Sequence, residues 1–475
     1  MPVGDLLPEL ILLLTAVAVM LAASFLAQRR QVWCAWLAGL GLLGSGMALV
    51  AQLSTPARLT FNGIWAIDGA SIWARLIMVV ATFIVVLLIP EWLRTDRRHG
   101  EYYAVLLFAT LGALFMAGAA DTMQLMIGVL LASITGYTLA AYHRGHDLSV
   151  EAGMKFFLVG ALTNSLLLIG IVWLFGLAGS TDYREIGAAL SESGNTVGWL
   201  VAAAFIVVGL AFKLGAVPAH TWMPEVAEGA PLPSAAYLMV IPKIGAALAL
   251  ARLGQMFTHE VDSWRALIAA LAVASMTLGN LAALRQTDLR RLLGWSSVSQ
   301  SGYALVAVAM IGWSPQALPA LLIFLAAYAA ANIAAFAVVT ELRGRTVIDQ
   351  YRGLASIHPW IMAVLTLALL SLVGIPPLAG FAGKLVPMLA AVEADYAWLA
   401  VVVVVNTVVS LFYYLRVIAP AYFVSSDGPM PTLGRGAWIA LSLSGLLTVV
   451  LGLGAGMLLQ ELESLELLPA LNAAA

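Results

Sequence analysis

The four lysines of this chain are its most promising residues for chemistry, because all of them fall within long apolar stretches: Lys155, Lys213, Lys243 and Lys384. A lysine at the centre of a bilayer costs at least about 2.5–3.5 kcal/mol. Burial favours the uncharged amine, so such a lysine can release and regain a proton, which an arginine cannot do in a protein. The pattern predicts proton handling inside a membrane.

Structural roles stay open for several polar residues near these lysines. Lys155 lies near the start of its stretch, so its side chain could extend to the membrane interface. His220 could cap carbonyls freed by a helix break, and Glu225 and Glu228 could be interfacial carboxylates. Asp121 is expected to be a helix N-cap.

Two of the lysines lie beside glycine- and proline-rich interruptions. Lys213 precedes the break at 214–218, and Lys384 follows the break at 374–377. A broken helix exposes backbone groups that polar side chains or water must satisfy, and water at mid-membrane serves a proton path.

The elements that must position these residues are membrane-spanning helices. Of the 475 residues, 62% are apolar and 10% are charged, against about 25% charged residues in soluble domains. The apolar runs are long enough to cross about 30 Å of hydrocarbon and lack the alternation of barrel strands. We therefore predict an all-α polytopic bundle of fourteen spans, near 8–27, 32–51, 73–93, 102–119, 122–142, 153–175, 197–217, 231–252, 265–284, 291–312, 317–341, 359–388, 397–420 and 436–459. The first span is expected to be a retained helix and not a signal peptide.

The two breaks fall in the seventh and twelfth spans, which are five spans apart. This spacing predicts two inverted five-helix repeats, made of spans four to eight and nine to thirteen, as in secondary transporters. The expected division is three N-terminal helices in 1–100, a first repeat in 101–255, a second in 264–422 and a last helix in 430–460.

The arginines set the orientation. With the N-terminus outside, the loops assigned to the inside hold fourteen arginines: Arg29, Arg30, Arg94, Arg97, Arg98, Arg144, Arg285, Arg290, Arg291, Arg343, Arg345, Arg352, Arg416 and Arg435. The outside loops hold four: Arg58, Arg184, Arg252 and Arg265. This positive-inside bias predicts that both termini are outside. Arg75, at the start of the third span, could extend to the interface.

Several function classes are excluded. The single cysteine, Cys34, rules out an internal disulfide and a cysteine-ligated cluster. No dinucleotide-binding fingerprint, flavin motif or basic patch for nucleic acid is present.

Three long segments resemble the antiporter-like, proton-translocating subunits of respiratory complex I, the NADH-quinone oxidoreductase. Residues 209–231 read GLAFKLGAVPAHTWMPEVAEGAP, residues 280–297 read NLAALRQTDLRRLLGWSS, and residues 374–384 read GIPPLAGFAGK. The resemblance extends over nearly the whole chain. The fourteen-span length of the chain, without a long lateral C-terminal helix, is typical of the subunit N branch of that family.

The resemblance implies a central line of charged groups. Lys213 matches the mid-channel lysine of the first half, Lys243 the connecting lysine and Lys384 the terminal lysine of the second half. Lys155 matches a lysine in the sixth span, and His220 lies within the first motif.

Two departures from the family pattern remove titratable groups. Leu130 stands where the family has a glutamate that pairs with the lysine of the seventh span, and Gln300 where it often has a histidine. Both indicate a divergent member with altered proton coupling or a complex with different energetics.

The resemblance favours a subunit of a translocase without a redox centre or metal of its own. NADH, FMN, iron–sulfur clusters and quinone would bind partner subunits of the membrane-embedded complex, in a bacterial inner membrane with both termini periplasmic. Two alternatives remain: a subunit of a multi-subunit cation/proton antiporter, and a non-conducting structural subunit.

Overall fold

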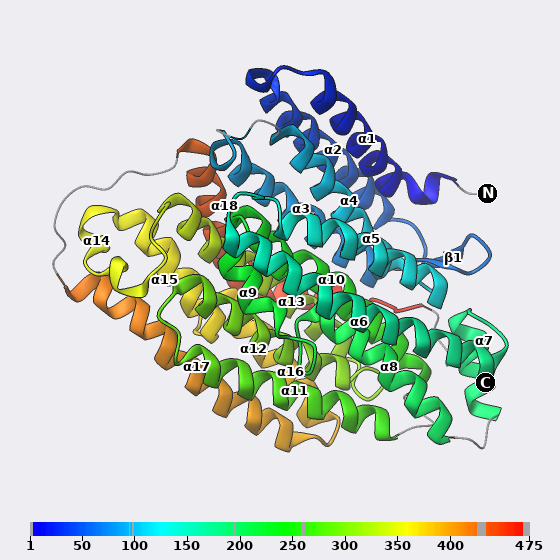
Figure 1. The fold of residues 1–475 in the computed structure, drawn as a ribbon. Helices are drawn as coiled ribbons and strands as arrows, with labels where there is room; N and C mark the ends of the chain where they lie inside the picture. The colour runs from blue at the N-terminus through cyan, green and yellow to red at the C-terminus, as the bar shows by residue number, and fades with distance from the viewer. Residues whose placement is uncertain are drawn as a thin grey trace.

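The computed structural model describes residues 3–94, 96, 99–192, 196–257, 262–424 and 434–468. Its long helices run side by side in one bundle, with α1 and α2 at one edge and α11 and α17 at the other (Figure 1). The α-helices are α1 Leu7–Phe25, α2 Val32–Gln52, α3 Gly69–Trp92, α4 His99–Gly118, α5 Thr122–Ala140, α6 Asp147–Ala178, α7 Tyr183–Glu192, α8 Thr196–Leu214, α9 Trp222–Gly229, α10 Leu232–Phe257, α11 Asp262–Ala283, α12 Leu289–Ala309, α13 Ala317–Glu341, α14 Leu354–Ile357, α15 Pro359–Val373, α16 Ala379–Glu393, α17 Ala397–Phe423, α18 Arg435–Leu453 and α19 Ala455–Glu463. Short 3-10 helices are η1 Val3–Leu6, η2 Gln28–Arg30 and η3 Ile348–Tyr351.

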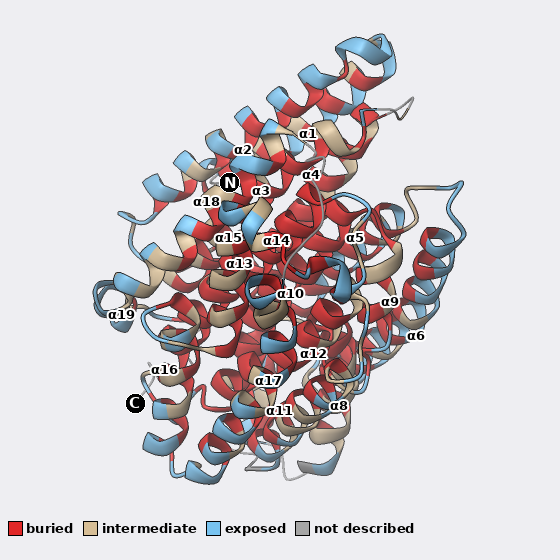
Figure 2. Ribbon diagram, turned by 90° about the vertical axis from the view of Figure 1, so that its left-hand side faces the viewer, coloured by how far each residue is buried: buried red, intermediate tan, exposed pale blue. Residues whose placement is uncertain are grey.

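Two helices lie at the centre of the bundle. The most apolar stretches of α10 and α13 are buried throughout, whereas those of α1 and α6 are mostly open on one side. Figure 2 shows this division as a buried interior with exposed outer helix faces. In a membrane the outer faces meet lipid or partner subunits, and only the interior can hold an ordered polar site.

The membrane character of the chain is confirmed. Twelve helices are long and apolar enough to span a bilayer. The two further spans expected from the sequence correspond to α12, which is more polar than the others, and to the broken pair α15 and α16. The total of fourteen spans stays a prediction.

Two sets of helices pack in a matching order, and their division into inverted repeats stays a prediction. In the first group α4 packs on α5, α5 on α6, and α6 on both α8 and α9. In the second group α11 packs on α12, α12 on α13, and α13 on both α15 and α16. The last member of each group, α10 or α17, also packs on the first member, α4 or α11. This equivalence is what two related repeats would produce.

A small hairpin departs from the all-α expectation. Strands β1 Arg58–Thr60 and β2 Trp65–Ile67 pair antiparallel between α2 and α3. Phe61, Asn62 and Gly63 take positive φ angles in the connecting turn. Asn-Gly is a strong signal for such a hairpin turn.

Arg75 lies inside the bundle and does not extend toward its surface. Its guanidinium is fully buried and pairs with Glu9 at 2.9 Å. Arg252 is likewise buried and pairs with Asp68 at 2.7 Å. An ion pair and hydrogen bonds make such a buried charge tolerable. The acidic partner cannot be identified from the position of the arginine in the sequence.

Candidate functional site: two helix breaks joined by a polar helix

The first break separates α8 from α9. Gly215 has φ +68° and ends α8 in the left-handed conformation that glycine adopts readily. The Phe212 carbonyl accepts a bond from the Trp222 indole at 3.0 Å. The Val217 amide donates to the Ser275 hydroxyl, also at 3.0 Å. Neutral donors and acceptors thus satisfy the backbone that the break frees.

Lys213 lies in the last turn of α8, directly before this break. Its side chain is buried, and Nζ lies 5.5 Å from the centre of the Phe212 ring. Among the residues that the structure describes, Nζ has no hydrogen-bond partner. The Lys213 amine is therefore held by packing and leaves its donors and lone pair available.

His220 lies in the connection between α8 and α9. Its ring packs 5.6 Å from the Trp295 ring, measured between centroids, and is largely buried. Nδ1 is buried without a hydrogen-bond partner in the described part of the chain. The structure thus places His220 on the same break as Lys213, as the sequence predicted.

The second break separates α15 from α16. Gly374 has φ +99° and ends α15, as Gly215 ends α8. Lys384 lies on the far side of the gap, in α16, and its Nζ donates to the Val373 carbonyl at 3.0 Å. The same Nζ lies 4.0 Å from the centre of the Tyr303 ring. Here the lysine itself satisfies a freed carbonyl.

Helix α12 reaches both breaks. The Ser301 hydroxyl donates to the Leu214 carbonyl at 2.5 Å, at the end of α8. The Gln300 amide donates to the Leu372 carbonyl at 3.0 Å, near the end of α15. Two adjacent side chains of one helix therefore hold the two breaks at a defined separation.

Lys243 occupies the middle of this arrangement on the fully buried helix α10. Its Nζ donates to the Ser297 carbonyl at 2.7 Å, to the Ser297 hydroxyl at 3.0 Å and to the Tyr328 hydroxyl at 3.3 Å. Three acceptors match the three protons of an ammonium group. The site can therefore hold the charged form of Lys243 without a carboxylate beside it.

The structure does not bring Lys155 to the other three lysines. It lies near the start of α6, its side chain is 44% exposed, and it pairs with Glu151 and Glu225 at 2.6 Å each. Arg291 pairs with Glu225 at 3.0 Å and with Glu228 at 2.6 Å. These residues form an ion-pair cluster beside the arginine-rich loops, which agrees with an interfacial position for Lys155, Glu225 and Glu228.

A wide cavity of about 1340 Å³ opens on the same face. Its lining includes Glu101, Tyr142, His143 and Glu228, and it reaches the start of α10 at Leu232.

The expected helix N-cap is present at the start of α5. Asp121 accepts hydrogen bonds from the Met123 and Gln124 amides at 2.7 and 3.0 Å.

Leu130 lies on the outward face of α5. It is 38% exposed and shares a stripe with Ile127 and Ile134. Helix α8, which carries Lys213, packs on α6 and α10 instead. Within this chain, position 130 therefore faces away from the helix that its family counterpart is expected to serve.

Sequence reasoning missed the polar groups around the path: Ser297 and Tyr328 bond Lys243, Ser301 bonds the Leu214 carbonyl, and Asn332 bonds Tyr328. A signal was present in α12, which carries four serines between positions 296 and 301 and is too polar to count as a span by hydropathy. Within the described residues, no group of histidine, cysteine, aspartate or glutamate side chains could hold a metal ion.

Comparisons with known proteins show the family of the chain. Residues 119–410 match the NADH:quinone oxidoreductase/Mrp antiporter transmembrane family. The chain is 44% identical to NADH-quinone oxidoreductase subunit N of Mycobacterium sp. (strain JLS), over 87% of this chain and 88% of that protein. It is 41% identical to NADH-quinone oxidoreductase subunit N 1 of Streptomyces griseus subsp. griseus, over 96% of this chain and 97% of that protein.

Solved structures share the fold over nearly the full length. A chain of respiratory complex I from Thermus thermophilus, solved with bound aureothin, superposes with a TM-score of 0.81 at 29% identity, covering 95% of this chain and 98% of that one. A chain of the Mrp complex from Dietzia sp. DQ12-45-1b superposes with a TM-score of 0.82 at 22% identity, covering 98% and 96%. The second likeness concerns the fold alone.

Proposed function

The chain belongs to the NADH:quinone oxidoreductase/Mrp antiporter transmembrane family, and we propose that it moves protons along the line Lys213, Lys243 and Lys384. It is a membrane-arm subunit of a proton-pumping NADH:quinone oxidoreductase, as its relatives are subunits of that enzyme. The observation that carries the proton path is the bridge formed by α12. Its residues contact both helix breaks and, through Ser297, Lys243.

The surroundings of the three lysines give each of them a different role in proton transfer. Lys213 has free donors beside the first break and exchanges protons with water that enters there, with His220 on the same connection as an accessory group. Lys243 holds a proton among three neutral acceptors. Lys384 bonds to the Val373 carbonyl and delivers protons at the second break.

The wide cavity on the arginine-rich face is the proposed side of proton entry. Its carboxylates and His143 line an opening that reaches α10. Lys155 belongs to the ion-pair cluster at this face and is assigned to holding α6 against α9, not to the path itself.

The rest of the proposal is supported by the family and by the distribution of arginines among the loops. The chain lies in a bacterial inner membrane with both termini periplasmic, in contact with other membrane-arm subunits and lipid. Partner subunits bind NADH, FMN, iron–sulfur clusters and quinone, and redox energy released there drives the protons here. The matching packing of α4–α10 and α11–α17 supports two inverted repeats.

A non-conducting structural role is the second candidate. Leu130 and Gln300 favour it, because each removes a titratable group that the family pattern provides. A cation/proton antiporter subunit is a third possibility, which the subunits that co-purify with this chain would reveal.

The test uses the complete complex, purified and reconstituted in vesicles. We expect Lys213→Ala and Lys384→Ala to lower NADH-driven proton pumping at least about tenfold, while electron transfer from NADH to an artificial acceptor shows that the complex is assembled. Lys155→Ala is the matched control and should pump normally. Normal pumping by both first variants in an assembled complex would leave only the structural role.

A further inference from the structure

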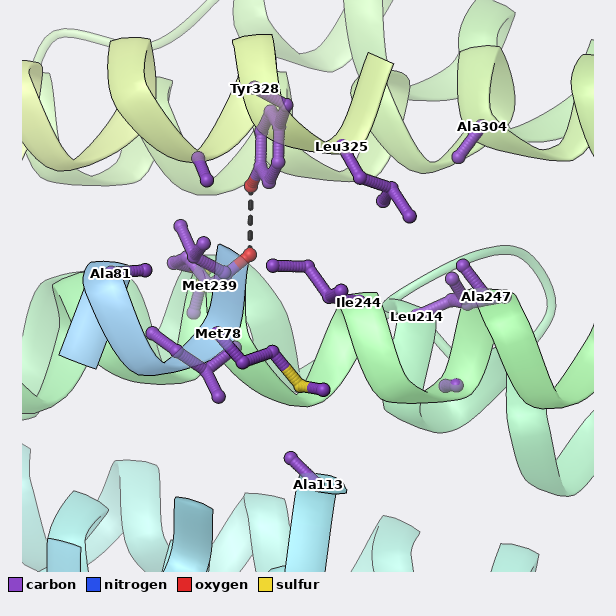
Figure 3. Packing of buried hydrophobic residues seen from close by; sticks show 14 of the residues in the cluster. Met78, Ala81, Ala113, Leu214, Met239, Ile244, Ala247, Ala304, Leu325 and Tyr328 are labelled. Carbon is purple, nitrogen blue, oxygen red and sulfur yellow. Dashed lines mark hydrogen bonds between the residues drawn. The ribbon is translucent and has the colours of Figure 1, made fainter. Parts of the chain in front are cut away.

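Tyr328 of α13 places its hydroxyl among polar groups of α10, α12 and α13 at the centre of the bundle. Its hydroxyl donates to the Met239 carbonyl of α10 at 2.8 Å, a bond that Figure 3 shows across the gap between the two helices. The same oxygen lies 3.3 Å from Nζ of Lys243 and 2.5 Å from the Ser297 hydroxyl. Apolar side chains of the buried core, among them Ile244 and Leu325, lie nearby (Figure 3).

The hydrogen bonds around this hydroxyl suit an exchange of donor and acceptor roles. With Lys243 charged, the ammonium donates to the Tyr328 oxygen, whose own proton goes to the Met239 carbonyl. With Lys243 neutral, its nitrogen has a lone pair and the phenol can donate to it. Asn332 donates to the same oxygen at 2.5 Å, so the ring stays in place in either state.

Tyr328 also lines a small cavity that ends at Lys384. The cavity measures about 10 Å³, and its lining includes Gln300, Ser371 and Gly380 besides Tyr328 and Lys384. About 10–15 Å³ is enough for the centre of one water molecule, and polar groups from several sides can bond it. Tyr328 therefore bonds Lys243 and also lines the water-sized cavity that Lys384 lines.

We propose that the Tyr328 hydroxyl relays protons between Lys243 and Lys384 through one water molecule in this cavity. The inference rests on the proposed proton path and adds the group that closes the gap between its second and third lysines. Ser297, bonded to both Lys243 and Tyr328, orients the relay.

The relay step balances without any oxidant or reductant. An N–H bond of the Lys243 ammonium breaks and its proton forms a new O–H bond on Tyr328. The original phenol O–H, turned from Met239 into the cavity, breaks and passes its proton to the water. The water gives a proton to the neutral Lys384 amine, so the tyrosine and the water end unchanged.

The test is Tyr328→Phe in the complete reconstituted complex. This substitution keeps the ring under Lys243 and removes only the hydroxyl. We expect at least about a tenfold loss of coupled proton pumping, within the range that positioned proton-transfer groups contribute. We also expect a larger solvent deuterium isotope effect on coupled turnover, since proton transfer becomes the slow step.

Tyr237→Phe is the matched control. Tyr237 is buried in α10, the helix of Lys243, and its hydroxyl bonds only to Thr110 among the described residues, at 3.2 Å. It should pump with the wild-type isotope effect. Equal losses in the two variants, with unchanged isotope effects, would assign Tyr328 a packing role and overturn the relay.

Lys243→Ala separates the relay from the underlying path. Loss of pumping in Lys243→Ala with normal pumping in Tyr328→Phe would refute the relay and keep the path. Normal pumping in both would refute both proposals.

Discussion

The two helix breaks place their lysines on opposite sides of the gap. At the first break Lys213 precedes the gap, and the freed backbone groups bond to Trp222, Ser275 and Ser301. At the second, Lys384 follows the gap and itself bonds to the Val373 carbonyl. Lys213 thus bonds none of the described residues, whereas Lys384 combines a structural hydrogen bond with its proposed role in proton transfer. Glycine- and proline-rich interruptions of similar sequence therefore place the two lysines in different electrostatic surroundings.

Arginine substitutions of Lys213 and Lys384 should show the largest difference between the two breaks. Lys213→Arg and Lys384→Arg both keep a positive charge but cannot release a proton, so each should lower pumping at least about tenfold. Only Lys384→Arg retains a donor for Val373. We therefore expect a normal yield of complex for Lys384→Arg and a reduced yield for Lys213→Arg, which buries a fixed charge without a partner.

Yield on native gels and pumping in vesicles are the two measurements. If Lys213→Arg assembled and pumped like the wild type, the amine at the first break would not need to exchange protons.

Substitutions of Gln300 and Ser301, the α12 side chains that bond the two breaks, should have the second largest effect. Gln300→Leu leaves the Leu372 carbonyl unpaired, and Ser301→Ala does the same to the Leu214 carbonyl. An unpaired buried carbonyl costs about 1–3 kcal/mol. Thermal unfolding of the purified complex in detergent should show a lower midpoint for each variant.

Ser165→Ala is the control for these two substitutions, because Ser165 is exposed and bonds only within its own helix. Unchanged midpoints in Gln300→Leu and Ser301→Ala would mean that water replaces these bonds and that α12 does not hold the breaks.

The glycines of the breaks should give a smaller and unequal effect. Gly215→Ala and Gly374→Ala each force a side chain into the left-handed region, at about 1–2 kcal/mol. A methyl at position 374 would also lie 3.2 Å from the Cδ atom of Lys384, whereas at position 215 it meets the flexible end of Met223. Gly374→Ala should therefore lower pumping more than Gly215→Ala at similar stability. Gly176→Ala is the control, because the added methyl meets none of the described residues within 4 Å. Equal pumping in both break variants would argue that Lys384 tolerates displacement.

Leu130→Glu should change least. Position 130 faces outward on α5, so a carboxylate there does not meet Lys213 within this chain. We expect pumping to stay within about twofold of the wild type, below the range of a positioned proton-transfer group. A marked gain would show that the assembled complex folds this face toward the first break. Ile127→Glu, on the same stripe, tests whether any gain is specific to position 130.

The sequence by itself determined the class of the protein and most residues of the proposed proton path. Long apolar runs can be satisfied in lipid only as helices, so the bundle followed from composition and period. Lys213, Lys243 and Lys384 stood out because lysines at mid-membrane are costly and the chain has four in all. The breaks were visible because glycine and proline interrupt helices by local rules.

Tertiary structure decided what surrounds each lysine. The partners of Lys243 come from α12 and α13, 54 and 85 residues away along the chain. No local pattern encodes such contacts, since they depend on how buried helices rotate against one another. The same packing exposed Lys155, buried Arg75 against Glu9 and turned Leu130 outward. Hydropathy assigns a residue to a helix, but only packing decides which face of that helix it occupies and therefore which charge it meets.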